Sequence, residues 1–139
     1  MKEAAEAGYD ALECVADGLG DLAKRYGVTV CGGYVGGPFH LPWNPATAEE
    51  KLLKPARQLA ALGGEFLTVN CDPKGTWAKR ERKTEDELKQ QGENLSRLAR
   101  DVKLPGLCIL MHNHANSNAI HQSPRLHGEI STIFLWNFA

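Results

Sequence analysis

The chain has 139 residues, of which 42% are hydrophobic and 24% charged, and its formal net charge is −1. This length suits one domain with a real core, and the composition is that of an ordinary globular protein. Because there is no basic stripe and no basic amphipathic helix, we expect no binding of nucleic acid or of a membrane surface. No apolar run approaches a membrane span, and residues 1–6 lack a signal-peptide core.

The cysteines predict a reducing environment. None of them is spaced as Cys-x-x-Cys, which argues against a zinc ribbon, and each falls in or just after a predicted strand; they are Cys14, Cys31, Cys71 and Cys108. We therefore expect small buried thiols in a cytoplasmic protein.

The first third of the chain alternates helix and strand. Residues 2–7 favour a helix, and residues 11–15 favour a short strand interrupted by Glu13. A helix with one apolar stripe follows and ends at Gly27. Residues 28–31 then form the second predicted strand. The glycine-rich residues 32–40 are predicted to be a loop too flexible to continue it, carrying His40 to the end of the strand.

The next unit begins with a helix signal. Thr47 and Glu50 fit a capping box, which predicts a helix starting there. Pro55 lies inside this helix, so we expect it either to kink the helix or to open a second segment. The third predicted strand covers residues 65–70 and places Asn70 at its carboxyl end.

A charged insert separates the third strand from a long helix. The insert, residues 73–83, carries five cations, but nearby acidic residues offset them and predict a solvated loop. Thr84 and Glu87 fit a second capping box for a helix that runs to about Asp101. The apolar run that follows, residues 108–114, predicts a buried strand ending in two histidines.

Strands that alternate with helices in this way predict an α/β fold with parallel strands and right-handed crossovers. The carboxyl ends of parallel strands meet at one rim, where ligands commonly bind. Asp72 directly follows Asn70 and Cys71, and both polar residues are candidate pocket groups, as is His40. His112 and His114 have the right chemistry for a metal, although rim histidines bonded to neighbouring loops would show the same pattern. Residues 115–139 break the alternation, and only residues 130–138 favour a strand or an apolar docking segment.

The chain resembles the xylose isomerase-like TIM-barrel family of sugar phosphate isomerases and epimerases. The resemblance rests on Glu-Ala-Gly-Tyr-Asp-Ala-Leu-Glu at residues 6–13, on Leu-Gly-Gly at 62–64 and on Leu-Met-His-Asn-His at 110–114. It implies that residues 1–114 form half of the barrel, with about four parallel strands, and that residues 115–139 are a separate tail. Half a barrel leaves two bare sheet edges, so we expect two copies to close a barrel-like homodimer.

The resemblance also implies a site. The family binds a divalent metal, often manganese, magnesium or zinc, and His112 falls on the first ligand position, where many members have Glu. Asn113 and His114 match the two residues that follow, which makes Asn113 a substrate-binding candidate and His114 a second metal-ligand candidate. Glu13 matches the acid that closes the second barrel strand and is the catalytic candidate.

The implied function is metal-assisted proton transfer next to the carbonyl of a small sugar-like substrate, as in an isomerase or epimerase. The alternative is a non-catalytic truncated half-barrel that self-associates as a structural or interaction module. A relative that acts on nucleic acid, as endonuclease IV does with this fold, is disfavoured by the near-neutral charge and the few zinc ligands.

Overall fold

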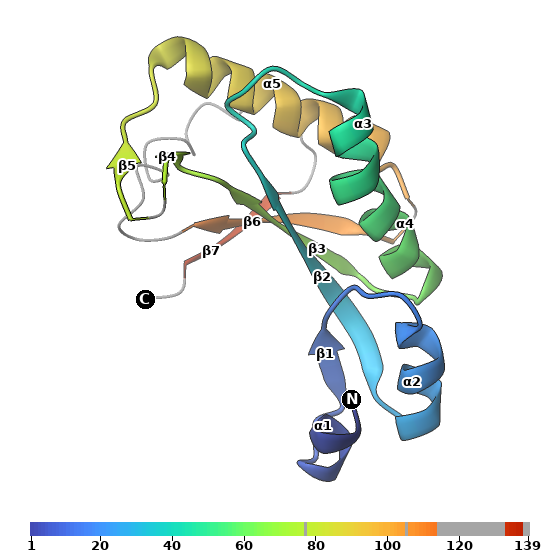
Figure 1. The fold of residues 1–139 in the computed structure, drawn as a ribbon. Helices are drawn as coiled ribbons and strands as arrows, with labels where there is room; N and C mark the ends of the chain where they lie inside the picture. The colour runs from blue at the N-terminus through green and yellow to red at the C-terminus, as the bar shows by residue number, and fades with distance from the viewer. Residues whose placement is uncertain (77, 105, 114–132, 138–139) are drawn as a thin grey trace.

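The structure, a computed structural model, describes residues 1–76, 78–104, 106–113 and 133–137. Their main feature is an open sheet of five strands in the order β1-β2-β3-β6-β7, in which every neighbouring pair is parallel (Figure 1). The strands are β1 (Ala11–Glu13), β2 (Thr29–Gly37), β3 (Phe66–Cys71), β6 (Cys108–Asn113) and β7 (Ile133–Asn137). Spatial order thus follows chain order, as in a barrel that stops before it closes. The expected half-barrel of parallel strands is confirmed.

Helices cover one face of this sheet. They are α2 (Leu19–Tyr26), α3 (Pro45–Ala48), the π-helical turn η1 (Glu49–Leu53), α4 (Lys54–Ala61) and α5 (Glu85–Asp101), whereas the short helix α1 (Lys2–Glu6) buries no residue and precedes β1. The core lies between the helices and the outer strand face, where Leu59 and Leu98 are fully buried with Leu67 and Val69. None of the helices in the described ranges lies on the opposite, inner face of the central strands (Figure 1). No helix in the described part of the chain is long and apolar enough to cross a membrane.

The glycine-rich stretch belongs to the sheet, and our prediction of a loop from residue 32 was wrong. Backbone pairing with β3 continues from Gly32 to Gly37, opposite Phe66 to Cys71. Close packing explains the glycines: a Cβ on Gly33 would lie 2.3 Å from Cγ2 of Val15. The glycines here allow neighbouring parts of the fold to approach closely, and they do not make the segment flexible.

The start of the third helical unit also differs from the prediction. The N-cap is Asn44, whose Oδ1 accepts a hydrogen bond from the Thr47 amide at 3.1 Å, with Pro45 in the first turn. Thr47 is therefore inside α3 and not its cap, since Asn44 followed by Pro45 satisfies the helix start one turn earlier. Of the two outcomes predicted for Pro55, the structure shows the second, in which the proline opens a new segment. Pro55 lies in the first turn of α4, the helix that directly follows η1.

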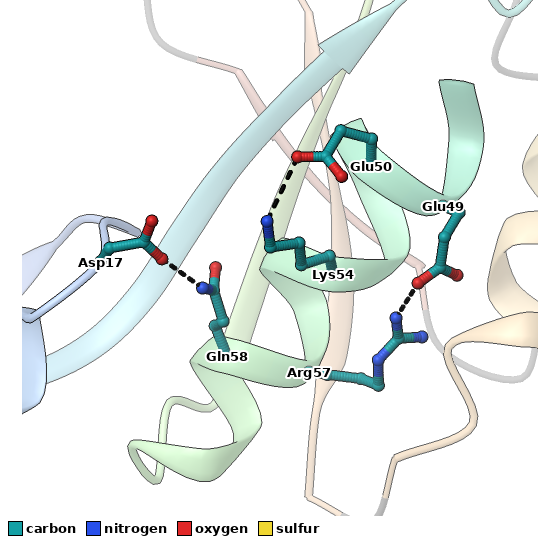
Figure 2. A network of polar contacts seen from close by, with 6 residues as sticks. All are labelled: Asp17, Glu49, Glu50, Lys54, Arg57 and Gln58. Carbon is teal, nitrogen blue, oxygen red and sulfur yellow. Dashed lines mark hydrogen bonds and ion pairs between the residues drawn. The ribbon is translucent and has the colours of Figure 1, made fainter. Parts of the chain in front are cut away.

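Exposed polar side chains of α4 make three contacts, of which one reaches another unit of the fold (Figure 2). Gln58 donates a hydrogen bond of 2.7 Å to Asp17, which precedes α2. Within the same helical unit Lys54 bonds Glu50 at 3.2 Å, and Arg57 pairs with Glu49. The contact between Gln58 and Asp17 therefore links two successive strand–helix units.

The insert and the long helix complete the described fold. Within the insert, β4 (Lys74–Gly75) and β5 (Arg80–Glu81) form a small antiparallel hairpin. The capping box at the start of α5 is confirmed: the Glu87 amide donates to Thr84 Oγ1 at 3.2 Å and the Thr84 amide to Glu87 Oε2 at 2.7 Å. These bonds fix the helix start immediately after the insert.

Candidate functional site

The inner face of the sheet carries a hollow of about 280 Å³. Side chains alternate between the two faces of a strand, so the residues that do not enter the helix-covered core gather here. The hollow is lined by residues from four strands, namely Glu13, Cys31, Gly32, Tyr34, Phe66, Thr68, Leu110, Met111 and His112. The structure therefore brings together two of the sequence-predicted residues, Glu13 and His112.

Glu13 is the last residue of β1 and is solvent exposed. It pairs with Gly32 of β2 after a shift in register at Leu12. A Cβ on Gly32 would lie 3.5 Å from Cγ of Glu13, so the glutamate stem extends over the bare glycine backbone. The carboxylate thus belongs to the wall of the hollow and is open to solvent.

His112 stands near the carboxyl end of β6, where it is paired with Asn70 of β3. Its ring meets the ring of Tyr34 edge to face, with 5.7 Å between centroids. The tyrosine is 49% exposed. Burial first, and then the charges of Asp72 and Glu13, raise the pKa of the Tyr34 hydroxyl, which favours its protonated form. Sequence reasoning missed Tyr34 because it placed this residue in a loop.

The other rim candidates lie behind or beside the hollow. Asn70 is buried in β3, and the Asp72 amide donates a hydrogen bond of 2.9 Å to the Gly37 carbonyl. His40 is only 7% exposed, and its buried Nδ1 has no hydrogen-bond partner. Burial and the charge of Lys83 lower the pKa of His40, so it is held neutral. None of these three residues lines the inner-face hollow.

A buried cation, which the sequence analysis assigned to a solvated loop, lies near His40. Lys83 is 6% exposed and donates a hydrogen bond of 2.7 Å to Gln91 of α5. Burial lowers the pKa of Lys83 and raises the pKa of the neighbouring Cys71 thiol to about 12. Lys83 lies directly before the Thr84 cap, and nothing in the sequence distinguishes it from the exposed cations of the insert, because its burial depends on Gln91 of α5.

The metal-ligand prediction is only partly covered by the described residues. His114 lies outside them, and for Asn113 the structure describes the backbone, paired with Asn137 of β7. Within the described ranges, no three His, Cys, Asp or Glu side chains gather closely enough to hold a metal ion. His112 alone is therefore not a complete metal site.

The fold and this rim define a class: an α/β barrel of the TIM type, present as an open half. No family model matches the sequence, and no curated protein matches it. Among solved structures, a xylose isomerase-like TIM-barrel protein from Mycobacterium smegmatis, in complex with magnesium, is similar with a TM-score of 0.61 at 10% identity, over 96% of this chain and 53% of that one.

Two sugar epimerases are similar as well. D-allulose 3-epimerase from Methylomonas sp., in complex with D-allulose, has a TM-score of 0.60 at 22% identity and covers 78% of this chain and 42% of its own. D-psicose 3-epimerase from Clostridium cellulolyticum H10, with D-tagatose, has a TM-score of 0.58 at 15% identity and covers 78% and 44%. The chain therefore has the fold of xylose isomerase-like barrels and spans about half the length of these structures.

Proposed function

We propose that the inner face of this half-barrel is one wall of a sugar isomerase or epimerase site, and that it acts by proton transfer next to a carbonyl. The observation that carries the proposal is the shared hollow, in which Glu13, Tyr34 and His112 come together on the inner face of the sheet. The similarity of the fold to epimerases with bound sugars supports a small sugar as the substrate class.

Each side chain has a distinct task in this proposal. Glu13 is the carboxylate that removes and returns the proton on the carbon beside the carbonyl. Tyr34, held protonated, donates a hydrogen bond to a substrate oxygen. Asn70, Asp72, Asn113 and His40 are proposed to bind substrate hydroxyls at the rim or to support the groups that do so.

A divalent metal, namely manganese, magnesium or zinc, is proposed as the cofactor, with His112 and His114 as ligands. When bound, such an ion polarises a carbonyl oxygen and stabilises the negative charge that follows proton removal. Because the described residues gather no three ligands, further ligands must come from outside this part of the chain.

A second copy of the chain is the proposed source of the missing wall. Within the described ranges no strand pairs with the outer edge of β1 or β7, and the inner face exposes 49% of Tyr34 and 40% of Phe66. Bare parallel edges and exposed aromatic rings favour association. Light scattering at micromolar concentration is expected to give a dimer, and a monomer would contradict this part of the proposal.

Proton transfer is tested by exchange with solvent. The chain is incubated with D-fructose or D-allulose and Mn²⁺ in D₂O, and deuterium entering the carbon beside the carbonyl is followed by NMR. Wild type is expected to catalyse exchange, and Glu13→Gln to lose at least about 100-fold in rate. Glu3→Gln, a matched change on the exposed helix α1, is expected to match wild type. Dimerisation without exchange would favour a non-catalytic, self-associating module instead.

A further inference from the structure

A second cavity, of about 290 Å³, lies on the other side of the sheet from the inner-face hollow. Its floor is the carboxyl end of β2 with Asp72, its roof is the segment from Pro38 to Asn44, and its walls come from α3, η1 and α5. The two cavities share no lining residue. This volume is near the lower limit of small-molecule sites, which suits a ligand the size of a monosaccharide.

The roof of this cavity is held in a fixed position. Nδ2 of Asn94, a buried residue of α5, donates hydrogen bonds to the carbonyls of Phe39 at 2.7 Å and Leu41 at 2.8 Å. Gln90 in turn donates to Oδ1 of Asn94 at 3.2 Å. The cavity is therefore built before any ligand arrives, which lowers the entropy cost of binding.

The lining combines one aromatic wall with dispersed polar groups. Trp43 is half-buried, and the guanidinium of Arg97 lies 5.0 Å from its ring centroid, which fixes the indole from one side. The lining residues also include Thr47, Lys51 and Asp72, whose side chains end in a hydroxyl, an ammonium and a carboxylate group. An aromatic face with scattered donors and acceptors suits a ring that has C–H groups on its face and hydroxyls at its edge.

Other ligand classes fit less well. A phosphate would meet the Asp72 carboxylate, and only the exposed Lys51 offers a positive charge among the lining residues. A purely apolar ligand would leave the carboxylate of Asp72 without a polar partner. A nucleotide needs more room than this cavity gives.

We propose that the cavity beneath the β2–α3 segment, walled by Trp43, Thr47, Lys51 and Asp72, is an accessory binding site for a neutral monosaccharide or similar polyol. This site shares no lining residue with the inner-face hollow, and of its walls only Asp72 is also among the residues proposed above to serve the substrate rim.

The test is a titration of the full chain with D-fructose, followed by ¹⁵N NMR of the backbone amides of Thr47 and Lys51 and of the Trp43 indole. A saturable shift of these signals is expected. Trp43→Ala is expected to weaken the binding measured at Thr47 and Lys51 by about tenfold, while Trp43→Phe, which keeps an aromatic wall, retains most of it. D-fructose 6-phosphate is expected to bind this site no more tightly than D-fructose.

Variants of the inner face separate this inference from the proposed function. Glu13→Gln and His112→Ala are expected to leave the shifts at Thr47 and Lys51 unchanged. The inference is overturned if these signals do not move at saturating sugar, or if folded Trp43→Ala binds as well as wild type. It is also overturned if binding is lost in His112→Ala but kept in Trp43→Ala, a result that would support the inner-face site alone.

Discussion

The ring of Tyr34 on β2 packs edge to face against the ring of His112 on β6, with 5.7 Å between centroids. The contact spans the intervening strand β3 and joins the two rings within the inner-face hollow. Tyr34→Ala is expected to lower the free energy of unfolding by about 1 kcal/mol, because the ring contact is lost. Tyr34→Phe keeps the ring and is expected to lie within about 0.5 kcal/mol of wild type. Urea denaturation measures both, and equal losses in the two variants would contradict a role for the ring contact.

Gly33 is expected to tolerate no side chain. Its added Cβ would lie 2.3 Å from Val15 and 3.1 Å from Leu59, so Gly33→Ala is expected to destabilise the fold by about 2–3 kcal/mol through overpacking. Gly37→Ala in the same strand is the matched control, since its Cβ would meet only Phe39 at an ordinary 3.9 Å. Thermal or urea unfolding that ranks the two variants equally would argue against a paired, closely packed β2.

Asn94 is expected to hold residues 38–44, the segment above the second cavity, in one conformation. Asn94→Ala removes both hydrogen bonds to the Phe39 and Leu41 carbonyls, at an expected cost of about 2 kcal/mol in unfolding free energy. Hydrogen exchange in residues 38–44 is expected to accelerate. Gln90→Ala, which removes only the bond to Asn94 Oδ1, serves as the control with a smaller expected effect. Unchanged exchange in the Asn94 variant would show that the segment is held by other contacts.

His40 gives the stability a defined pH dependence. Its pKa is lowered in the fold, first by burial and then by Lys83, so the unfolded chain binds the proton more readily. Stability is therefore expected to fall as the pH drops below the unfolded value of about 6.5 and to stop falling once the pH passes the folded pKa. The neighbouring charges of Glu87, Asp72 and Lys74 also act on this ring.

The matched variant for this prediction is His40→Asn, which removes the titrating group. The slope of unfolding free energy against pH just below 6.5 is expected to flatten in the variant. Glu87 titrates in a lower window, because its hydrogen bonds with Thr84 and Lys74 lower its pKa to about 2, so its contribution is lost only below about pH 4.5. An unchanged slope in His40→Asn would exclude His40 as the cause.

Local sequence patterns predicted most of the fold. The capping box at Thr84 and the helix that runs to Asp101 were confirmed, because both depend on residues within one helix. The strand through Gly32–Gly37 was missed, since the use of glycine there depends on Val15 and Leu59, which are distant in sequence. The division of the chain at residue 114 stays a prediction, although β7 within the second segment extends the sheet.

The candidate site could be predicted only in part for the same reason. Glu13 and His112, the candidates at the ends of their predicted strands, both line the inner-face hollow, while the roles proposed for them stay predictions. Other features depend on how α5 packs over the segment from Pro38 to Asn44. These features are the burial of His40 and Lys83 and the hydrogen bonds from Asn94 to that segment. No spacing in the sequence encodes that arrangement.

The most direct test of the inner-face site is metal retention by the full chain after dialysis, measured by elemental analysis. The protein is loaded separately with Mn²⁺, Mg²⁺ and Zn²⁺, and His112→Ala is compared with His40→Asn, whose histidine does not line the inner-face hollow. The proposal predicts stoichiometric retention of one of these metals by wild type and by His40→Asn, and its loss from His112→Ala. Wild type that retains none of the three, or His112→Ala that retains as much as wild type, would contradict it.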